Sequence, residues 1–340
     1  MPETVHIRQV GPRLWTIAPV GAPTLLDSAP GLDTAVLEAV GGHLSWSLLT
    51  GHRIPAATVH DLAAAQDWLW ALYGVAVAVA VDDYAGPVDL PARPERPEVA
   101  AATRRLAYAH WAARWWPAST VDGIAALDPD LLDRETVSLI EECDLVVDGA
   151  DARLPDEEAV PVPVSARADD YALAAGGTPG ERFGALVIGR GSGGWDWRRC
   201  PPGLLDASEH AVSWELTRTA GSTFVRVEVV TAPGVTHEVP VHLRPRALVR
   251  TAAGDGDIEL QLLGDSWVGT SDLASENIAV VEVYVPGVGP AAPGPDDPDQ
   301  RRRVRELAAG RLRLAALSDG DTDLAPLLAE TAAAMTDTDF

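Results

Sequence analysis

The sequence predicts a helix-rich α+β domain, followed by an antiparallel β-sandwich of immunoglobulin-like architecture and a helical C-terminal tail. Apolar residues recur at helical spacing before residue 150, and they alternate with polar residues from about residue 183 onward. Proline- and glycine-rich segments separate these regions. We therefore expect an α+β domain over 1–150, an acidic linker over 151–181, a β-sandwich over 182–288, and a second linker with C-terminal helices over 289–340.

The chain should begin with a β-hairpin. Val5 and Ile7 alternate with polar residues, and Gly11 starts a turn before the apolar residues resume. The segment 33–49 fits either a helix or a strand, because a glycine pair interrupts its apolar pattern. Its type is left open at this point.

The clearest helix signal follows. Thr58 is a candidate N-cap, Asp61 lies three residues later at capping-box spacing, and Gly74 is a natural C-terminal stop. The run Val75–Val81 alternates valine with alanine, and its β-branched residues favour a short buried strand. Two further helices are predicted downstream, at Glu98–Trp116 and at about Pro129–Val147.

From residue 183 the apolar period changes to two, as in Val225, Val227 and Val229. Short alternating strands with Gly- and Asp-rich turns are typical of a β-sandwich. About seven strands are expected, at Ala185–Ile188, Val212–Leu216, Val225–Val229, Val239–Leu243, Ala247–Arg250, Ile258–Leu262 and Ile278–Val285. Two helices should follow, at Arg301–Leu317 and Thr322–Met335.

The charge composition restricts the classes of function. All 26 basic residues are arginine, which excludes lysine Schiff bases and a phosphate-loop lysine, and the formal net charge is −24. Such an acidic chain is poorly suited to nucleic acid or to an anionic membrane, so we expect neither as a partner. The missing lysine also fits the codon bias of a high-GC, actinobacterial-like genome. A cytoplasmic location is expected, because the two cysteines are far apart and no secretory signal is visible.

Three patterns resemble ligand motifs but lack their structural context. Gly189–Gly194 matches G-x-G-x-x-G, yet two prolines at 201–202 prevent the helix that would receive a pyrophosphate, so we expect a loop. His237 and His242 are five residues apart, whereas a zinc helix needs four. Acidic residues at 319, 321, 323 and 330 follow EF-hand spacing without its glycine, which favours an acidic helix cap. We therefore predict no metal, no cofactor and no catalytic residue.

Tryptophan is the most suggestive residue type, because 11 tryptophans outnumber 5 tyrosines and 3 phenylalanines. Tyr108, Trp111 and Trp115 form a stripe on the second predicted helix, separate from its aliphatic stripe. A helix that is apolar on two faces is either enclosed in its domain or bound by a partner. Core packing is the favoured interpretation, and a protein interface is the alternative.

A second aromatic cluster combines Trp195 and Trp197 with Arg198 and Arg199, in a segment bounded by glycines and prolines. Tryptophan and arginine are enriched at binding hot spots, and loops usually lie at the surface. These four residues are therefore candidates for a protein interface. Packing of the rings against one end of the sandwich is the competing interpretation.

These observations favour a non-catalytic interaction or scaffold protein of a cytosolic bacterial multi-protein assembly, with an unknown protein partner. The alternative is an enzyme or small-molecule-binding protein with a tryptophan-lined pocket in the helical domain, formed by Trp68, Trp70, Trp111 and Trp115. A third hypothesis is a regulatory subunit that delivers its C-terminal helix to a partner.

Overall fold

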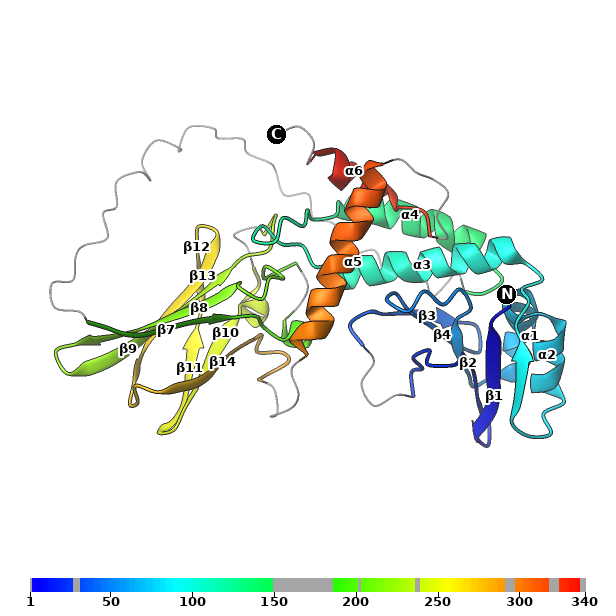
Figure 1. Ribbon diagram of the computed structural model, residues 1–340, viewed down its shortest axis with the longest axis horizontal. Helices are drawn as coiled ribbons and strands as arrows, with labels where there is room; N and C mark the ends of the chain where they lie inside the picture. The colour runs from blue at the N-terminus through cyan, green and yellow to red at the C-terminus, as the bar shows by residue number, and fades with distance from the viewer. Residues whose placement is uncertain are drawn as a thin grey trace.

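The computed structural model describes residues 2–26, 31–148, 186–200, 203–235, 239–290, 297–317 and 324–336. The predicted linker 151–181 lies outside these ranges, so the predicted domain boundaries stay predictions. An antiparallel sheet with helices forms the N-terminal part, and further antiparallel sheets and C-terminal helices follow (Figure 1). Buried apolar residues of both parts form one continuous cluster.

The N-terminal part contains a six-stranded antiparallel sheet in the order β3-β4-β5-β2-β1-β6. Its strands are β1 (Thr4–Gly11), β2 (Leu14–Pro19), β3 (Thr34–Ala39), β4 (Gly42–Ser47), β5 (Ala56–Val59) and β6 (Val88–Pro91). The β1–β2 hairpin confirms the predicted one, and the ambiguous segment 33–49 forms the β3–β4 hairpin. Four helices accompany the sheet, namely α1 (Leu62–Tyr73), α2 (Val75–Asp82), α3 (Pro97–Trp115) and α4 (Pro129–Glu142).

Helix α1 forms where the sequence predicts a helix, but its cap differs. Asp61 is the N-cap and its side chain accepts a hydrogen bond from the Ala64 N–H, whereas Thr58 lies in β5 and pairs with β2 and β4. Gly74 ends α1 at φ 91°, a left-handed conformation that favours glycine. A Cβ atom on Gly74 would also collide with the backbone of Arg93. The chain therefore turns sharply between α1 and α2.

The strand prediction for Val75–Val81 is wrong, because this run forms the helix α2. A continuous apolar run carries no periodicity that separates a strand from a helix. In the helix, Val77, Ala78 and Val81 are buried at helical spacing, while Val75 and Val79 share an exposed face. The tertiary packing of α2 against β1 and β6 outweighs the β propensity of valine.

The C-terminal part holds a five-stranded sheet, β12-β13-β9-β8-β7, and a three-stranded sheet, β11-β10-β14. The strands are β7 (Leu186–Gly193), β8 (Val212–Thr219), β9 (Ser222–Val230), β10 (Arg246–Thr251), β11 (Gly254–Glu259), β12 (Gln261–Leu263), β13 (Ser266–Leu273) and β14 (Ile278–Tyr284). Both sheets are antiparallel, as expected, and both are open. This topology does not confirm the immunoglobulin-like sandwich.

Two strand predictions differ from the structure here. Val239–Leu243 was expected to be a strand, but Val241–Leu243 forms a 3₁₀ turn, in which the Pro240 carbonyl accepts the Leu243 N–H. Proline cannot donate to a strand ladder, which disfavours a strand at this position. Conversely, β13 has no alternating apolar pattern and was missed, although it pairs with β9 along its whole length.

The C-terminal helices α5 (Pro298–Ala316) and α6 (Leu328–Thr336) return to the N-terminal part. Helix α5 runs between the two parts of the molecule, and α6 lies beside α4 and the outer end of α5 (Figure 1). The final helix starts later than the predicted Thr322, at Leu328. Position 297 supplies the cap of α5, since the Asp297 side chain accepts from the Gln300 N–H.

Candidate functional site

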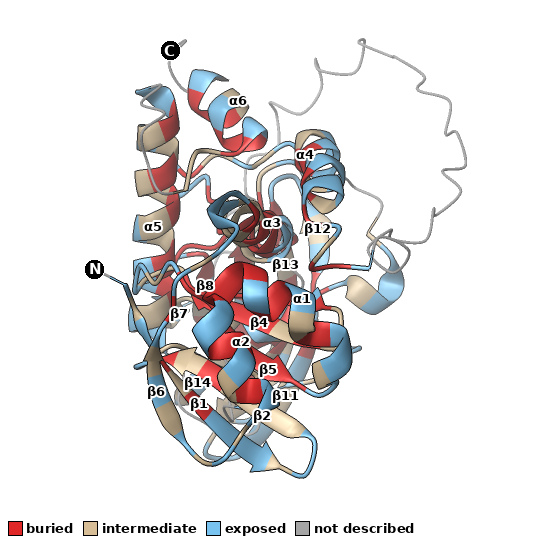
Figure 2. Ribbon diagram, turned by 90° about the vertical axis from the view of Figure 1, so that its right-hand side faces the viewer, coloured by how far each residue is buried: buried red, intermediate tan, exposed pale blue. Residues whose placement is uncertain are grey.

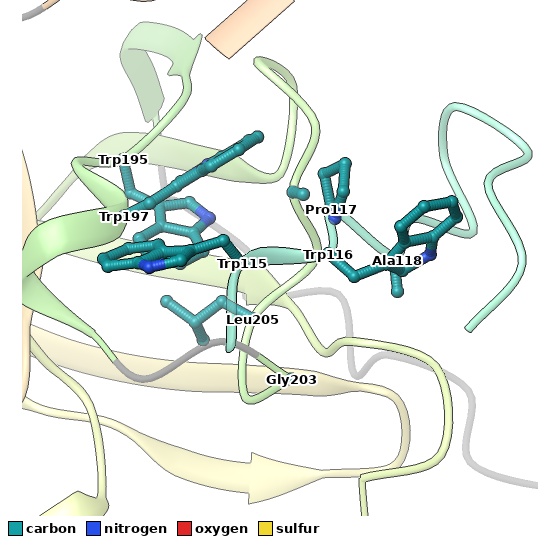
Figure 3. Close-up of a pocket in the computed structure, with 9 residues that line it drawn as sticks. Trp115, Trp116, Pro117, Ala118, Trp195, Trp197, Gly203 and Leu205 are labelled. Carbon is teal, nitrogen blue, oxygen red and sulfur yellow. The ribbon is translucent and has the colours of Figure 1, made fainter. Parts of the chain in front are cut away.

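The two parts of the chain meet at a cluster of four tryptophans. Trp115 and Trp116 lie at the end of α3, Trp195 and Trp197 follow β7, and all four line a small cavity of about 20 Å³. The rings of Trp115, Trp195 and Trp197 lie together, whereas the Trp116 ring points away from them (Figure 3). The cavity volume is enough for about one water molecule and is far below that of an ordinary ligand pocket. The cavity is lined by Trp115, Trp116, Pro117, Ala118, Trp195, Trp197, Gly203, Leu205 and Ala207.

The two tryptophans after β7 are buried but are not equivalent. Each is 4% exposed, and their ring centroids are 6.4 Å apart. The Trp195 indole N–H donates to the Asp206 carbonyl at 2.8 Å. The Trp197 indole N–H has no acceptor among the described residues. The first ring therefore orients the junction through a hydrogen bond, and the second contributes apolar area only.

Paired substitutions should separate these two roles. Trp195→Phe leaves the buried Asp206 carbonyl without its donor, so it should lower the free energy of unfolding by about 1–2 kcal/mol more than Trp197→Phe. Both changes remove a similar ring area, which makes each the control for the other. Urea unfolding followed by fluorescence measures the difference. Equal losses for the two variants would contradict the assigned role of the Trp195 hydrogen bond.

Asp206 is a fully buried carboxylate at the centre of this junction. Its Oδ1 accepts from the Ser119 hydroxyl at 2.7 Å and the Ser208 N–H at 2.9 Å. Its Oδ2 accepts from the Thr120 N–H at 2.7 Å, the Thr120 hydroxyl at 3.0 Å and the Val121 N–H at 3.3 Å. Within the described ranges no cation pairs with it. The loop after α3 is thus held to the C-terminal part by hydrogen bonds to one carboxylate.

Helix α5 adds ion pairs to the same junction. Arg301 binds Glu209 through two parallel contacts of 2.7 and 2.8 Å, and its side chain is almost completely buried. Arg305 bridges Glu209 at 2.8 Å and Asp122 at 3.1 Å. Burial alone would raise the pKa of Glu209, but hydrogen bonds from Arg301 and Arg305 and their charges hold it below its ordinary range. These contacts connect α5 to both parts of the chain.

Acid should weaken this junction. Because the pKa of Glu209 is lower in the folded state, its contribution is complete above its ordinary pKa and is lost as the pH falls through the lowered value. Glu209→Gln should therefore be less stable than the parent chain near about pH 7, and this gap should shrink near about pH 3. Urea unfolding at both pH values tests this. The exposed Glu259→Gln is the control, and a constant gap for Glu209→Gln would oppose the interpretation.

A second buried network fixes the last helix. Glu330 is fully buried, and its carboxylate binds the Arg311 guanidinium through contacts of 2.9 and 2.6 Å. It also accepts from the Tyr108 hydroxyl at 2.5 Å and the Leu327 N–H at 2.7 Å. Burial, followed by the charge of Glu330, raises the pKa of Tyr108 well above its ordinary range. Glu330 therefore caps α6 and also holds α3, α5 and α6 together. Positions 319, 321 and 323 of the predicted acidic cap lie outside the described residues.

The predicted interface residues divide into buried and exposed groups. Tyr108 and Trp111 stack in the core at 5.7 Å between centroids, and the Trp111 indole donates to the Leu32 carbonyl at 2.7 Å. Trp115 is half-buried, as is Arg199, and Arg198 is exposed. The rings of Trp195 and Trp197 face the junction instead of solvent. A role of these seven residues in partner binding stays a prediction.

The glycine-rich motif is part of a strand, so the predicted loop is wrong. Gly189–Gly193 belongs to β7 and pairs with β8, and Gly191 lies opposite Trp214. A Cβ atom on Gly191 would overlap the Trp214 ring. The glycines therefore give room to an indole on the neighbouring strand.

The cysteines lie in apolar surroundings. Cys143 and Cys200 are free and buried, and burial raises the pKa of both thiols, that of Cys143 to about 11. Cys200 follows Arg198 and Arg199 in sequence, and cationic neighbours activate a thiol only when it is exposed, which the burial of Cys200 prevents. Within the described residues no three histidine, cysteine or carboxylate side chains gather as a metal site requires. No helix in the described ranges is long and apolar enough to cross a bilayer.

The four tryptophans of the predicted pocket are not brought together. Trp68 is buried and donates to the Val40 carbonyl at 2.7 Å, and neither it nor Trp111 lines the junction cavity. Trp115 lines that cavity, while Trp70 lies on a separate groove of about 270 Å³ between α1 and α2. The groove is lined by Gln66, Asp67, Trp70, Val75, Ala78, Val79 and Asp82.

Sequence reasoning missed this groove. Trp70 is 40% exposed, and Val75 and Val79 are each 52% exposed. Treating Val75–Val81 as a buried strand concealed the surface. A strand puts all four valines of this run on one face, whereas a helix separates Val75 and Val79 from the buried Val77 and Val81. The available signal was the absence of any polar residue within the run Val75–Val81.

Comparison with known proteins finds no matching family model, no matching curated protein and no matching solved structure.

Proposed function

We propose that the chain is a non-catalytic interaction or scaffold protein of a bacterial cytoplasmic multi-protein assembly. The buried acidic and basic groups described above serve internal contacts: Asp206 and Glu209 hold the junction, and Glu330 holds the last helix. The immunoglobulin-like sandwich expected from the sequence belongs to this proposal, as an architecture often used for binding.

The exposed apolar face of α1 and α2 is the observation that carries the proposal. Trp70, Val75 and Val79 are exposed on α1 and α2. These two helices lie over the N-terminal sheet (Figure 2). An exposed tryptophan in a concave apolar site is typical of a binding hot spot, because burial by a partner removes a large area from water. The fold itself gains little from these outward-facing side chains.

The alternative of an enzyme or small-molecule-binding protein stays a second hypothesis. Of the four tryptophans of its predicted pocket, Trp115 lines the junction cavity of about 20 Å³ and Trp70 lines the α1–α2 groove, while the other two line neither. Cavities for drug-sized ligands enclose roughly 300–1,000 Å³. The groove is closer to that range, and its open apolar surface fits a partner's side chain better than an enclosed substrate.

Affinity capture from a lysate of the source organism tests the proposal. The parent chain should enrich a partner identified by mass spectrometry, and Trp70→Ala should lose it, with a binding cost above about 2 kcal/mol. Leu317→Ala is the matched control, because Leu317 is 75% exposed elsewhere on the surface. Thermal melting should be unchanged in both variants. Equal capture by the parent and Trp70→Ala would contradict the assignment of this face.

A further inference from the structure

We infer that the α1–α2 groove binds an arginine side chain, presented by an apolar segment of a partner protein. The inference rests on the proposed interaction function and specifies the chemistry that this face recognises. It combines an apolar floor, two carboxylates and an exposed indole in one groove of about 270 Å³. That space is comparable to one large side chain.

The apolar floor of the groove comes from both helices. Trp70 lies on α1, and Val75 and Val79 lie on α2 beyond the sharp turn at Gly74. Such a floor suits the three methylene groups of an arginine side chain, which bury well against apolar surface while the charged end stays at the rim. The partly exposed Trp70 ring also provides a face on which a guanidinium can stack.

Two carboxylates supply the complementary charge. Asp67 and Asp82 both line the groove, and the Gln66 amide donates to the Asp82 Oδ1 at 3.4 Å. Within the described part of the chain, neither aspartate forms a salt bridge with an arginine or histidine. Asp122 and Glu209 differ in this respect, because both form salt bridges with Arg305 of α5. The groove therefore presents unmatched negative charge beside apolar surface.

The charge of the whole chain favours the same occupant. A formal net charge of −24 attracts a cationic segment over long range and repels an acidic one. Among cationic side chains, arginine fits best, since its planar guanidinium can stack on an indole and donate to two carboxylates at once. Lysine offers a compact charge that cannot stack in this way.

A pair of peptides tests the inference directly. The probes are acetyl-Leu-Arg-Leu-amide and the same peptide with citrulline, which keeps the shape of arginine but has no charge. The response is the indole N–H signal of Trp70 in a two-dimensional NMR spectrum of the full chain, assigned with Trp70→Phe. The arginine peptide should shift this signal saturably and bind at least about ten-fold more tightly than the citrulline peptide.

Charge variants of the groove provide a second test of the inference. Asp67→Asn combined with Asp82→Asn should remove the preference for arginine over citrulline. Asp83→Asn changes the charge of an exposed neighbour that does not line the groove, and it should leave the preference intact. Equal binding of both peptides to the parent chain, or no shift of the Trp70 signal, would overturn the inference. Concentration-dependent self-association lost in Trp70→Ala would assign the groove to a second copy instead, which also overturns it.

These results are separable from the proposed function. If a partner is captured through Trp70 but the arginine peptide shows no preference over citrulline, the interaction function stands and the arginine assignment fails. If the arginine peptide binds with the expected preference but the lysate yields no Trp70-dependent partner, the groove chemistry stands and the scaffold proposal fails.

Discussion

Glu330→Ala is expected to lower the free energy of unfolding by about 3–5 kcal/mol, the usual effect of removing one member of a buried ion pair. The change leaves the buried Arg311 guanidinium without its carboxylate and removes the acceptor of the Tyr108 hydroxyl and the Leu327 N–H. Arg311 would keep its contacts to the carbonyls of Leu324 and Ala325 and its position over the Tyr108 ring, none of which carries a negative charge. Urea unfolding measures the loss.

Two further variants make this result specific. Glu306→Ala removes an exposed carboxylate paired with Arg302 on α5 and should cost less than about 1 kcal/mol. Arg311→Met combined with Glu330→Met removes both charges of this buried pair. The double variant should therefore lose less free energy of unfolding than the sum of the losses of the two single variants. A loss for Glu330→Ala no greater than that for Glu306→Ala would show that the buried pair does not hold α6.

Asp206→Ala should destabilise the junction on a similar scale, about 3–5 kcal/mol, because it removes the buried acceptor of five donors, two of which belong to the buried Ser119 and Ser208. Asp206→Asn should be nearly as damaging. In one orientation its NH₂ group faces the Ser208 N–H, and in the other it faces the N–H groups of Thr120 and Val121. A backbone N–H cannot act as an acceptor, so neither orientation of the amide restores the hydrogen-bond network.

The exposed Asp133→Asn on α4 provides the control for the lost charge and should change stability by less than about 0.5 kcal/mol. Chemical unfolding and limited proteolysis report the outcome. We expect Asp206→Asn to expose the loop after α3 to protease at a lower urea concentration than the parent chain. Full stability of Asp206→Asn would mean that the loop is held by apolar contacts and not by its hydrogen bonds.

Local signals predicted the elements whose pattern and context agree. The β1–β2 hairpin, α1 and α3 each have the apolar period and the turn residues of their structure, and each forms where expected. The run Val75–Val81 failed because valine propensity and continuous apolarity favour a strand, whereas the packing of α2 on the sheet decides its structure. β13 was missed because its place is set by β9 and β12, which local pattern does not encode.

The sites were harder to predict for a related reason. Asp206 and Glu330 each accept hydrogen bonds from residues that are distant in sequence, and no sequence motif relates either carboxylate to those residues. Trp195 and Trp197 could be recognised as a cluster, but their burial depends on contact with the end of α3, which only the tertiary structure reveals. The groove at Trp70 could be found only after the helical state of α2 was known.

The Tyr108–Glu330 contact has a consequence for synthesis on the ribosome. Its partners are 222 positions apart, and Arg105 similarly reaches the Pro326 carbonyl near the C-terminus at 2.9 Å. Helix α3 is therefore made long before the carboxylate that satisfies its buried Tyr108 hydroxyl exists, whereas Arg105 already has a nearer partner in Glu135. The N-terminal part therefore cannot reach its final packing until Pro326 and Glu330 have left the ribosome, so its core is completed late in synthesis.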